Sequence, residues 1–214
     1  MKKMRMLAGV VLFGSIWGLM ECALGDYLHN VGFSSGAIMT GFIGLGLMAV
    51  SRRIYGIRGM QLGMGAVAGM LKFLHPVGGC LLCSAIAIAV EGALFEMIWY
   101  SPRISINRIN GIEMKVSMGI ISGYVIYTLG YVATQVLTPL VVSAPFYLSD
   151  LLAVIPKILS SGTIAGLAGG LTLTMVLSIP NDVASRMVEI KKEVYYPVAS
   201  LVSILCWAGI IMLP

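Results

Sequence analysis

The chain has 214 residues, of which 58% are hydrophobic and only 11% are charged, and its mean hydropathy is +0.95. Because soluble domains carry about 25% charged residues, this composition excludes an ordinary soluble protein and indicates a membrane protein. The 26 glycines fit the same class, since small residues let membrane helices pack closely. The formal net charge of +5 reflects membrane topology, because the basic residues lie between apolar segments, and we expect no nucleic-acid binding.

Seven apolar segments are candidates for membrane spans, because a helix needs about 20 mostly apolar residues to cross a bilayer. The third is short and glycine-rich, which is compatible with a tilted or re-entrant segment. Pro139 and Pro156 are expected to kink or end the helices that contain them. The sequence predicts an all-α polytopic membrane protein with one transmembrane domain, in which six core helices are followed by a seventh, C-terminal one. The spans lie at residues 6–28, 34–50, 60–74, 79–100, 115–142, 151–179 and 195–213.

The basic residues predict the orientation of these spans. The first apolar run contains Glu21 and lacks a cleavage pattern, so it is interpreted as a span and not as a signal peptide. Twelve of the fourteen Lys and Arg fall on alternate loops, and the positive-inside rule places those loops in the cytoplasm. We therefore expect a protein of the cell inner membrane, with its N-terminus inside and its C-terminus outside. The twelve are Lys2, Lys3, Arg5, Arg52, Arg53, Arg58, Arg103, Arg108, Lys115, Arg186, Lys191 and Lys192.

The predicted outer ends of four spans carry polar stripes at helical spacing. Ionisable groups in lipid cost several kcal/mol unless they face a cavity or a partner, so the stripes predict a polar pocket open to the outside. The alternative is mutual neutralisation, with Lys72 paired to Glu21 or Glu91. Glu96 lies nearer the inner end and is expected to pair with basic residues there. The predicted ligand-binding residues are Glu21, Asp26, His29, Lys72, His75, Cys80, Cys83, Glu91 and Lys157, and Asp150 is their expected neighbour.

The outer stretch LHPVGGCLLC, residues 74–83, allows three interpretations. His75, Cys80 and Cys83 are ligands that suit zinc, copper(I) or the metal of a corrin or haem. Cys80 and Cys83 also form a Cys-x-x-Cys motif, which could be a redox disulfide in an oxidising compartment. The third interpretation is structural, with the proline ending one helix and the glycines turning the chain.

The sequence shows no motif for a nucleotide-hydrolysing or hydrolytic centre. It has no phosphate-binding Gly-x4-Gly-Lys-Ser/Thr loop, no Gly-x-Ser-x-Gly elbow and no His-Glu-x-x-His motif. We therefore expect no catalytic residues in the leading interpretation, and any energy for transport has to come from a partner.

The chain resembles the substrate-binding membrane subunits of energy-coupling-factor transporters, which capture vitamins and trace metals. Three stretches carry the resemblance: AGVVLFGSIWG in the first span, GMQLGMGAVAGML in the third and AIAIAVEGALFEMI in the fourth. The resemblance implies a six-helix fold with an outward pocket, and a coupling subunit with ATPases as partner. It also implies a docking surface of small residues on the first helix, here Gly14 and Gly18. The seventh span departs from the family pattern.

The solitary cobalamin-binding members of that family use a cysteine as a ligand to the corrin metal, and the resemblance gives this part to Cys80. The leading hypothesis is a transport subunit that binds a small vitamin-like or metal-containing cofactor from the outer face, for uptake with an energising partner. One alternative is a membrane thiol–disulfide oxidoreductase that uses Cys80 and Cys83 with a quinone as electron acceptor. Another is a non-catalytic membrane assembly protein whose partners are lipid and other proteins.

Overall fold

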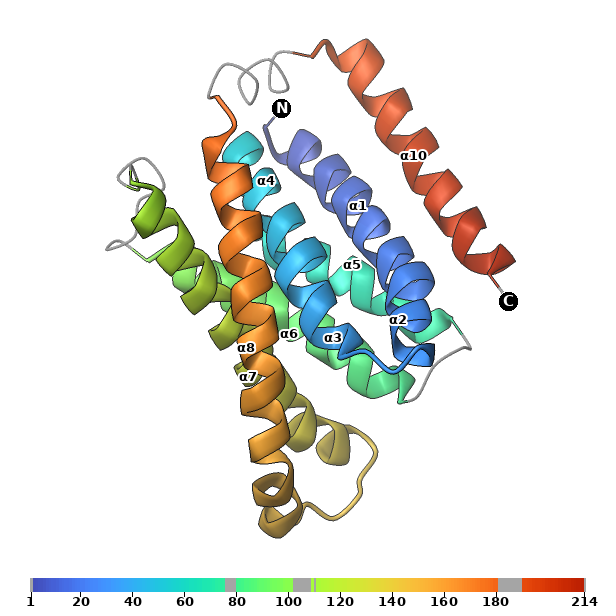
Figure 1. The fold of residues 1–214 in the computed structure, drawn as a ribbon. Coiled ribbons are helices and arrows are strands. Elements are labelled where there is room, and N and C mark those ends of the chain that lie inside the picture. The colour runs from blue at the N-terminus through green and yellow to red at the C-terminus, as the bar shows by residue number, and fades with distance from the viewer. Residues whose placement is uncertain (1, 76–79, 102–108, 110, 181–189, 214) are drawn as a thin grey trace.

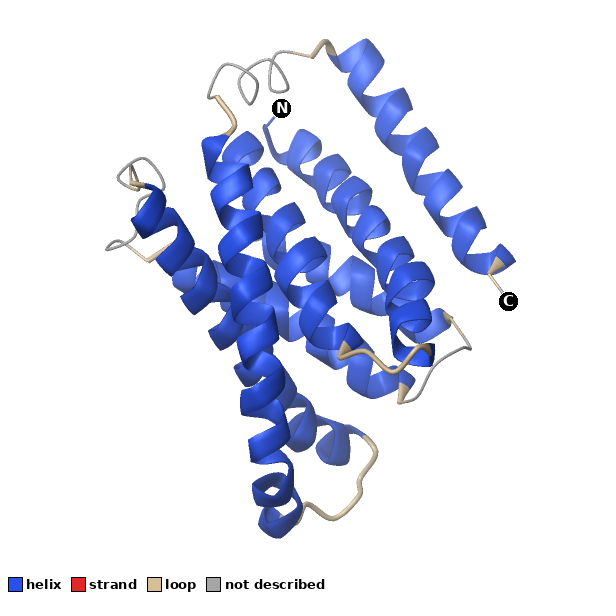
Figure 2. Cartoon of the chain, viewed as in Figure 1, coloured by secondary structure: helices blue, strands red, loops and turns tan. Residues whose placement is uncertain are grey.

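The computed structural model describes residues 2–75, 80–101, 109, 111–180 and 190–213. All of the regular structure in these ranges is helical, with no strand among them (Figure 2). The first helix is α1 (Lys2–Met20), which continues through a π-helical segment η1 (Glu21–Gly25) into α2 (Asp26–Asn30). The second pass also contains a π-helical segment, and it consists of α3 (Ser35–Met39), η2 (Thr40–Gly44) and α4 (Leu45–Tyr55).

Five further helices follow within the described ranges, so that a helix occupies each of the seven apolar segments. They are α5 (Met60–Leu74), α6 (Leu81–Trp99), α7 (Ile112–Val141), α8 (Leu148–Ser178) and α10 (Lys192–Met212). Six of the seven are long and apolar enough to cross a membrane, which makes this a multi-pass membrane protein by its helices. The exception is α5, whose 15 residues span about 22 Å. The bounds otherwise differ from the predicted ones by a few residues, as helix ends commonly do.

Successive helices run in opposite directions between two ends of the bundle (Figure 1). One end, called the basic end below, is where Tyr55 at the end of α4 meets Tyr195 at the start of α10, with 2.6 Å between their hydroxyl oxygens. At the other end, Lys72 in the last turn of α5 reaches Asp26 at the start of α2. The short helix α5 therefore runs between the same two ends as its neighbours α1 and α6.

Basic side chains at the basic end bind backbone and aromatic groups there. The Arg58 side chain donates to the carbonyl of Tyr100 at 2.9 Å, and the Arg52 guanidinium lies 3.8 Å from the centre of the Tyr100 ring. Arg53 donates to the carbonyl of Ile179 at 2.8 Å. Such contacts join the ends of α4, α6 and α8. The predicted basic partner of Glu96 is replaced by a different arrangement.

The carboxylate of Glu96 accepts hydrogen bonds from the backbone N–H groups of Gln61 and Leu62, at 3.0 and 3.3 Å. These groups lie in the first turn of α5, where backbone N–H groups have no partner within the helix. A negative charge there also opposes the positive end of the helix dipole favourably. Glu96 therefore caps a neighbouring helix, and none of the ion pairs among the described residues involves it.

Glycines allow both the tight turn before α5 and the close packing of α5 against α6. Gly56 and Gly59 have φ angles of 59° and 89°, a left-handed conformation that other residues adopt at a cost. They let α4 and α5 join through four residues. Within α5, a Cβ atom on Gly65 or Gly69 would lie 2.7 or 2.6 Å from a backbone oxygen of α6, so glycine is what allows the two helices to touch at their backbones.

The predicted docking surface on the first helix is occupied by this chain itself. A Cβ atom on Gly14 would lie 2.7 Å from Val67, and one on Gly18 would lie 2.9 Å from Leu71, both in α5. The other side of α1 faces α10, where the indole N–H of Trp207 donates to the Ser15 hydroxyl at 2.7 Å. The first helix therefore lies between α5 and α10.

Helices α7 and α8 form a long hairpin that extends beyond the other helices at the end opposite the basic end (Figure 1). At 30 and 31 residues, each is about 45 Å long, against about 30 Å for the hydrocarbon core of a bilayer. Pro139 and Pro156 lie inside these helices, so the prediction that either residue ends its helix was wrong. The hairpin supplies the far wall of the cavity described next.

Candidate functional site

A cavity of about 580 Å³ lies at the end of the bundle opposite the basic end. Residues of the first and second passes, α5, α6, α7 and α8 line it, and none of its lining residues comes from α10. Ligand sites for small molecules have volumes of about 300–1,000 Å³, so the cavity has the size of such a site. Its position between six passes gives it walls that are held by helix packing.

The lining changes from exposed to buried with depth. Rim residues such as His29, Phe33, Cys80 and Lys157 are exposed. The floor is buried but polar, and its hydroxyl, phenol and carboxyl groups come from four different passes. The buried floor residues with polar side chains are Thr40, Lys72, Glu91, Tyr127, Thr134 and Ser161. A polar floor enclosed by apolar helices is expensive to form without a function, because each buried polar group needs a partner.

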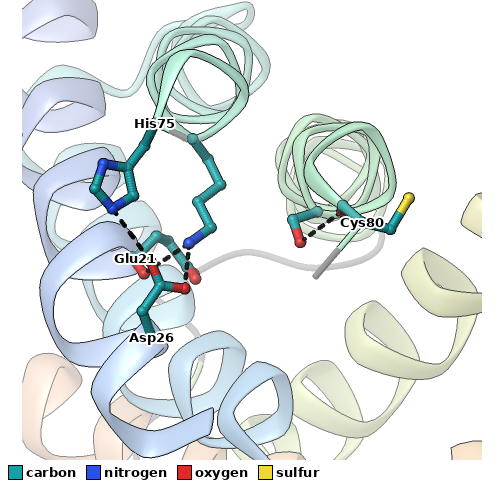
Figure 3. Close-up of polar contacts among 6 residues, drawn as sticks. Glu21, Asp26, His75 and Cys80 are labelled. Atoms are coloured by element: carbon teal, nitrogen blue, oxygen red, sulfur yellow. Dashed lines mark hydrogen bonds and ion pairs between the residues drawn. The ribbon is translucent and has the colours of Figure 1, made fainter. Parts of the chain in front are cut away.

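Lys72 is held by Asp26 inside the protein. Its ammonium lies 2.5 Å from Asp26 Oδ1, and only 6% of its side chain is exposed. His75 Nε2 lies 3.5 Å from the other oxygen of Asp26, and the three side chains come from α5 and α2 (Figure 3). The alternative of mutual neutralisation is thus what the structure shows for Lys72, although with Asp26 as the partner in place of Glu21 or Glu91. The positive charge of Lys72 is already compensated without a ligand.

Glu91 is buried without such compensation. Only 5% of the residue is exposed, and its Oε1 lies 2.6 Å from the hydroxyl oxygen of Thr40. Its second oxygen, Oε2, is buried and has no hydrogen-bond partner among the residues that the structure describes. Neither ion pair found among the described residues involves Glu91. The floor of the cavity therefore holds a carboxyl group without a cation.

A second carboxyl group, that of Glu21, lines the same cavity. The indole N–H of Trp17 donates to Glu21 Oε1 at 3.1 Å, which fixes the side chain from one turn earlier in the helix. Glu21 begins the π-helical segment η1, and Thr40 begins η2. Wide π-helical turns occur mostly as single turns within α-helices, frequently at functional sites. Here both of them contribute side chains to one cavity.

Cys80 and Cys83 form a disulfide at the rim, where α6 begins. Cys80 precedes the first turn, and its Sγ accepts a hydrogen bond from the Cys83 N–H at 3.2 Å. In this state neither sulfur is a thiolate. The predicted glycine turn falls on residues 76–79 of the stretch LHPVGGCLLC, which lie outside the described residues.

The metal-binding interpretation does not fit this arrangement. Figure 3 shows His75 turned toward Asp26, while Cys80 lies on a separate helix with its sulfur pointing away from them. No group of three His, Cys, Asp or Glu side chains in the described part of the chain is placed to hold a metal ion. A corrin metal would need a free Cys80 thiolate, which the disulfide removes. We therefore derive no step that passes through a metal.

The structure brings together most of the residues that the sequence singled out. Of the nine predicted binding residues, His75 alone is absent from the lining, and its Nε2 lies 3.5 Å from Asp26 Oδ2. Asp150, their expected neighbour, lies away from the cavity in the first turn of α8, beside Ser149. The eight that line the cavity are Glu21, Asp26, His29, Lys72, Cys80, Cys83, Glu91 and Lys157.

Sequence reasoning missed the contribution of α7. Tyr127, Tyr131 and Thr134 line the cavity, and their spacing of four and three residues places them on one helix face. A polar stripe of this kind in an apolar span was a signal that could have been used. Thr40 was also missed, and a single hydroxyl in an apolar run carries no such signal.

Comparison of the chain with protein-family models, with curated proteins and with solved structures finds no match. The functional conclusion therefore depends on the geometry of the cavity and on the chemistry of its lining.

Proposed function

We propose that this protein binds a small, vitamin-like molecule from the outer face of the cell inner membrane and takes part in its uptake. The observation that carries the proposal is the cavity of about 580 Å³ with a buried polar floor inside an apolar helix bundle. Ionisable residues at membrane depth are costly and are retained mainly where they face a ligand, an ion path or each other. Glu91 has no cationic partner among the described residues, so a purely structural pairing does not account for it.

The proposed topology has seven crossings, with the basic end in the cytoplasm, the N-terminus inside and the C-terminus outside. Arg5, Arg52, Arg58, Lys115 and Lys192 lie at or near helix ends on that side, as the positive-inside rule requires of cytoplasmic loops. The cavity then opens away from the cytoplasm, where a nutrient from outside would enter it.

Uptake in this proposal depends on an energising partner, as the resemblance to energy-coupling-factor subunits implies. Because Gly14 and Gly18 pack against α5, the partner has to dock on another surface. Exposed apolar side chains on α8 offer one, among them Leu167, Leu171 and Met175.

The test is whether a small molecule accompanies the full-length protein purified from its own membranes. Ala87→Trp would place an indole in the cavity wall, while Ala66→Trp places the same ring on an exposed position of α5. Mass spectrometry of released compounds should find a ligand in the wild type and in Ala66→Trp, and a loss in Ala87→Trp. Cells that produce the protein should then accumulate that compound faster than cells without it. No released compound from the wild type would contradict the proposal and favour an assembly role.

The disulfide supports a second candidate, a thiol–disulfide oxidoreductase. Cys80 and Cys83 lie at the start of a helix and at an exposed rim, which is where reactive Cys-x-x-Cys pairs occur. Cys22 and Cys206 are both free and buried. Thiol trapping in intact cells would favour this candidate if the pair is found partly reduced and a Cys83→Ser variant captures a protein substrate as a mixed disulfide.

A further inference from the structure

We propose that the molecule recognised by this cavity is an organic cation with N–H groups, a protonated amine or amidine, whose charged nitrogen binds Glu91 in exchange for a proton. The inference rests on the proposed function and adds the chemical class of the ligand. The inference does not use Lys72 as a partner for an acidic ligand group, because Asp26 already holds Lys72 at 2.5 Å.

The carboxyl group of Glu91 has no cationic partner among the described residues. Glu91 is 5% exposed, and its Oε2 is buried without a hydrogen bond. An ionised carboxylate in this position is strongly unfavourable unless a cation joins it. A ligand ammonium or amidinium supplies both the charge and the N–H donors that Oε2 lacks.

The two contacts of the Thr40 hydroxyl indicate the protonation state of Glu91. The hydroxyl oxygen of Thr40 lies 2.8 Å from the carbonyl oxygen of Gly36 and 2.6 Å from Glu91 Oε1. A hydroxyl has one proton and can donate it to only one of these acceptors. Both contacts are hydrogen bonds only if Glu91 carries a proton and donates it to Thr40. In this arrangement Glu91 is neutral.

Binding is then an exchange with balanced charge. The carboxylic acid of Glu91 gives up its proton to solvent, the carboxylate forms an ion pair with the protonated amine, and the Thr40 hydroxyl turns to donate to Oε1. The site gains one positive charge and loses one. The ionisable groups that line the cavity with Glu91 are Glu21, Asp26, His29, Lys72, Tyr127, Tyr131 and Lys157. Lys72 is paired with Asp26, and Lys157 and His29 lie at the exposed rim.

The rest of the lining suits the same ligand class. The rings of Tyr127 and Tyr131 are 6.0 Å apart on α7 and line the cavity, and aromatic faces attract organic cations. Glu21 supplies a second carboxyl group. The cationic side chain of Lys157 lies at the exposed rim, so the negative groups are deep and this positive one is shallow.

The test uses two matched sets of probes with the full-length protein in detergent. One set is phenylethylamine, phenylethanol and phenylacetate, and the other is tryptamine, tryptophol and indole-3-acetate. Within each set the ring is constant while the charge is positive, absent or negative. Binding is measured by calorimetry, and the thermal midpoint without probe shows that each variant is folded. The variants are Glu91→Gln, and Glu96→Gln as the matched change on the same helix, where Glu96 caps α5 outside the cavity.

We expect at least one amine to bind about tenfold or more tightly than its alcohol, because a buried charged pair adds about 1.4 kcal/mol or more. The preference should be lost in Glu91→Gln and kept in Glu96→Gln. The affinity of the wild-type protein for that amine should rise by about tenfold per pH unit, because binding releases one proton. Equal binding of amine and alcohol in both sets, or a preference for the acids, would overturn the proposal. A pH-independent affinity would overturn the exchange.

The outcome also separates this inference from the function on which it rests. If the compound released from the wild-type protein is acidic or neutral, the binding function stands and the cation inference fails. If nothing is released and no probe binds, both fail.

Discussion

At the scale of single residues, the structure buries charge in two different ways. Lys72, Asp26 and His75 form a charged group in which the Lys72 ammonium lies 2.5 Å from Asp26 Oδ1 and His75 Nε2 lies 3.5 Å from Asp26 Oδ2. Glu91 has only a hydroxyl neighbour and a free oxygen. Replacing a whole buried ion pair by apolar groups often costs little stability. Removing only one partner is strongly destabilising, because it leaves the other charge uncompensated. The first group is therefore expected to matter for stability, and Glu91 for binding.

The Lys72–Asp26 ion pair is expected to stabilise the fold. Lys72→Met should lower the free energy of unfolding by about 3 kcal/mol, because the Asp26 carboxylate, whose side chain is only 15% exposed, loses its lysine partner. Adding Asp26→Asn should restore most of this loss, since the uncompensated charge is gone. Denaturant unfolding of the purified protein in detergent is the measurement. Lys157→Met is the control at an exposed position, where the change should stay within about 0.5 kcal/mol. Equal losses in the two lysine variants would refute the pairing.

At the scale of elements, backbone geometry decides which side chains reach the cavity. The π-helical turns at Glu21–Gly25 and Thr40–Gly44 each interrupt an otherwise regular helix, and each presents a polar side chain to the same space. The glycines of α5 allow that helix to lie against α6 at backbone distance. Close packing of α5 and α6 places Lys72 and Glu91 in one lining although they belong to different helices.

The close packing of α5 against α6 is expected to depend on Gly69. A Cβ atom on Gly69 would lie 2.6 Å from the carbonyl oxygen of Ala85, which is closer than such atoms can approach. Gly69→Val should therefore push α5 from α6 and cost about 2 kcal/mol. Ala66→Val introduces the same side chain on the exposed face of α5 and should leave the unfolding midpoint nearly unchanged. A Gly69→Val protein as stable as the control would show that α5 does not lie this close to α6.

The helices could be predicted from the sequence because apolar length alone reports them, and the third segment, 60–74, coincides with α5. Side-chain partners could not be predicted in the same way. Asp26 was predicted to bind a ligand, but the helix continues through it to Asn30 and its carboxylate lies against Lys72. Periodicity counted at 3.6 residues per turn also fails across a π-helical turn. In the first pass, Gly14 and Gly18 pack against α5, whereas Glu21 and His29 line the cavity.

At the scale of the whole molecule, the two ends of the bundle differ in chemistry. Arginine and lysine side chains gather at one end, where they bind carbonyl groups and the Tyr100 ring. The other end holds the cavity and the projecting hairpin of α7 and α8. Such an asymmetry gives a membrane protein its orientation, since positively charged loops stay in the cytoplasm. The same asymmetry decides from which side a ligand can enter.

We expect the two ends of the bundle to lie on opposite sides of the membrane, with α5 as a full crossing. In a background with all four native cysteines replaced by serine, single cysteines are placed at the exposed positions Gly111, Ser149 and Met212. A membrane-impermeant maleimide added to intact cells should label Ser149→Cys and Met212→Cys, because both lie at the end opposite the basic residues. Gly111→Cys, at the start of α7 on the basic end, should react only after the membrane is opened. Labelling of Gly111→Cys from outside would reverse the orientation, and the cavity would then face the cytoplasm and serve export or intracellular binding in place of uptake.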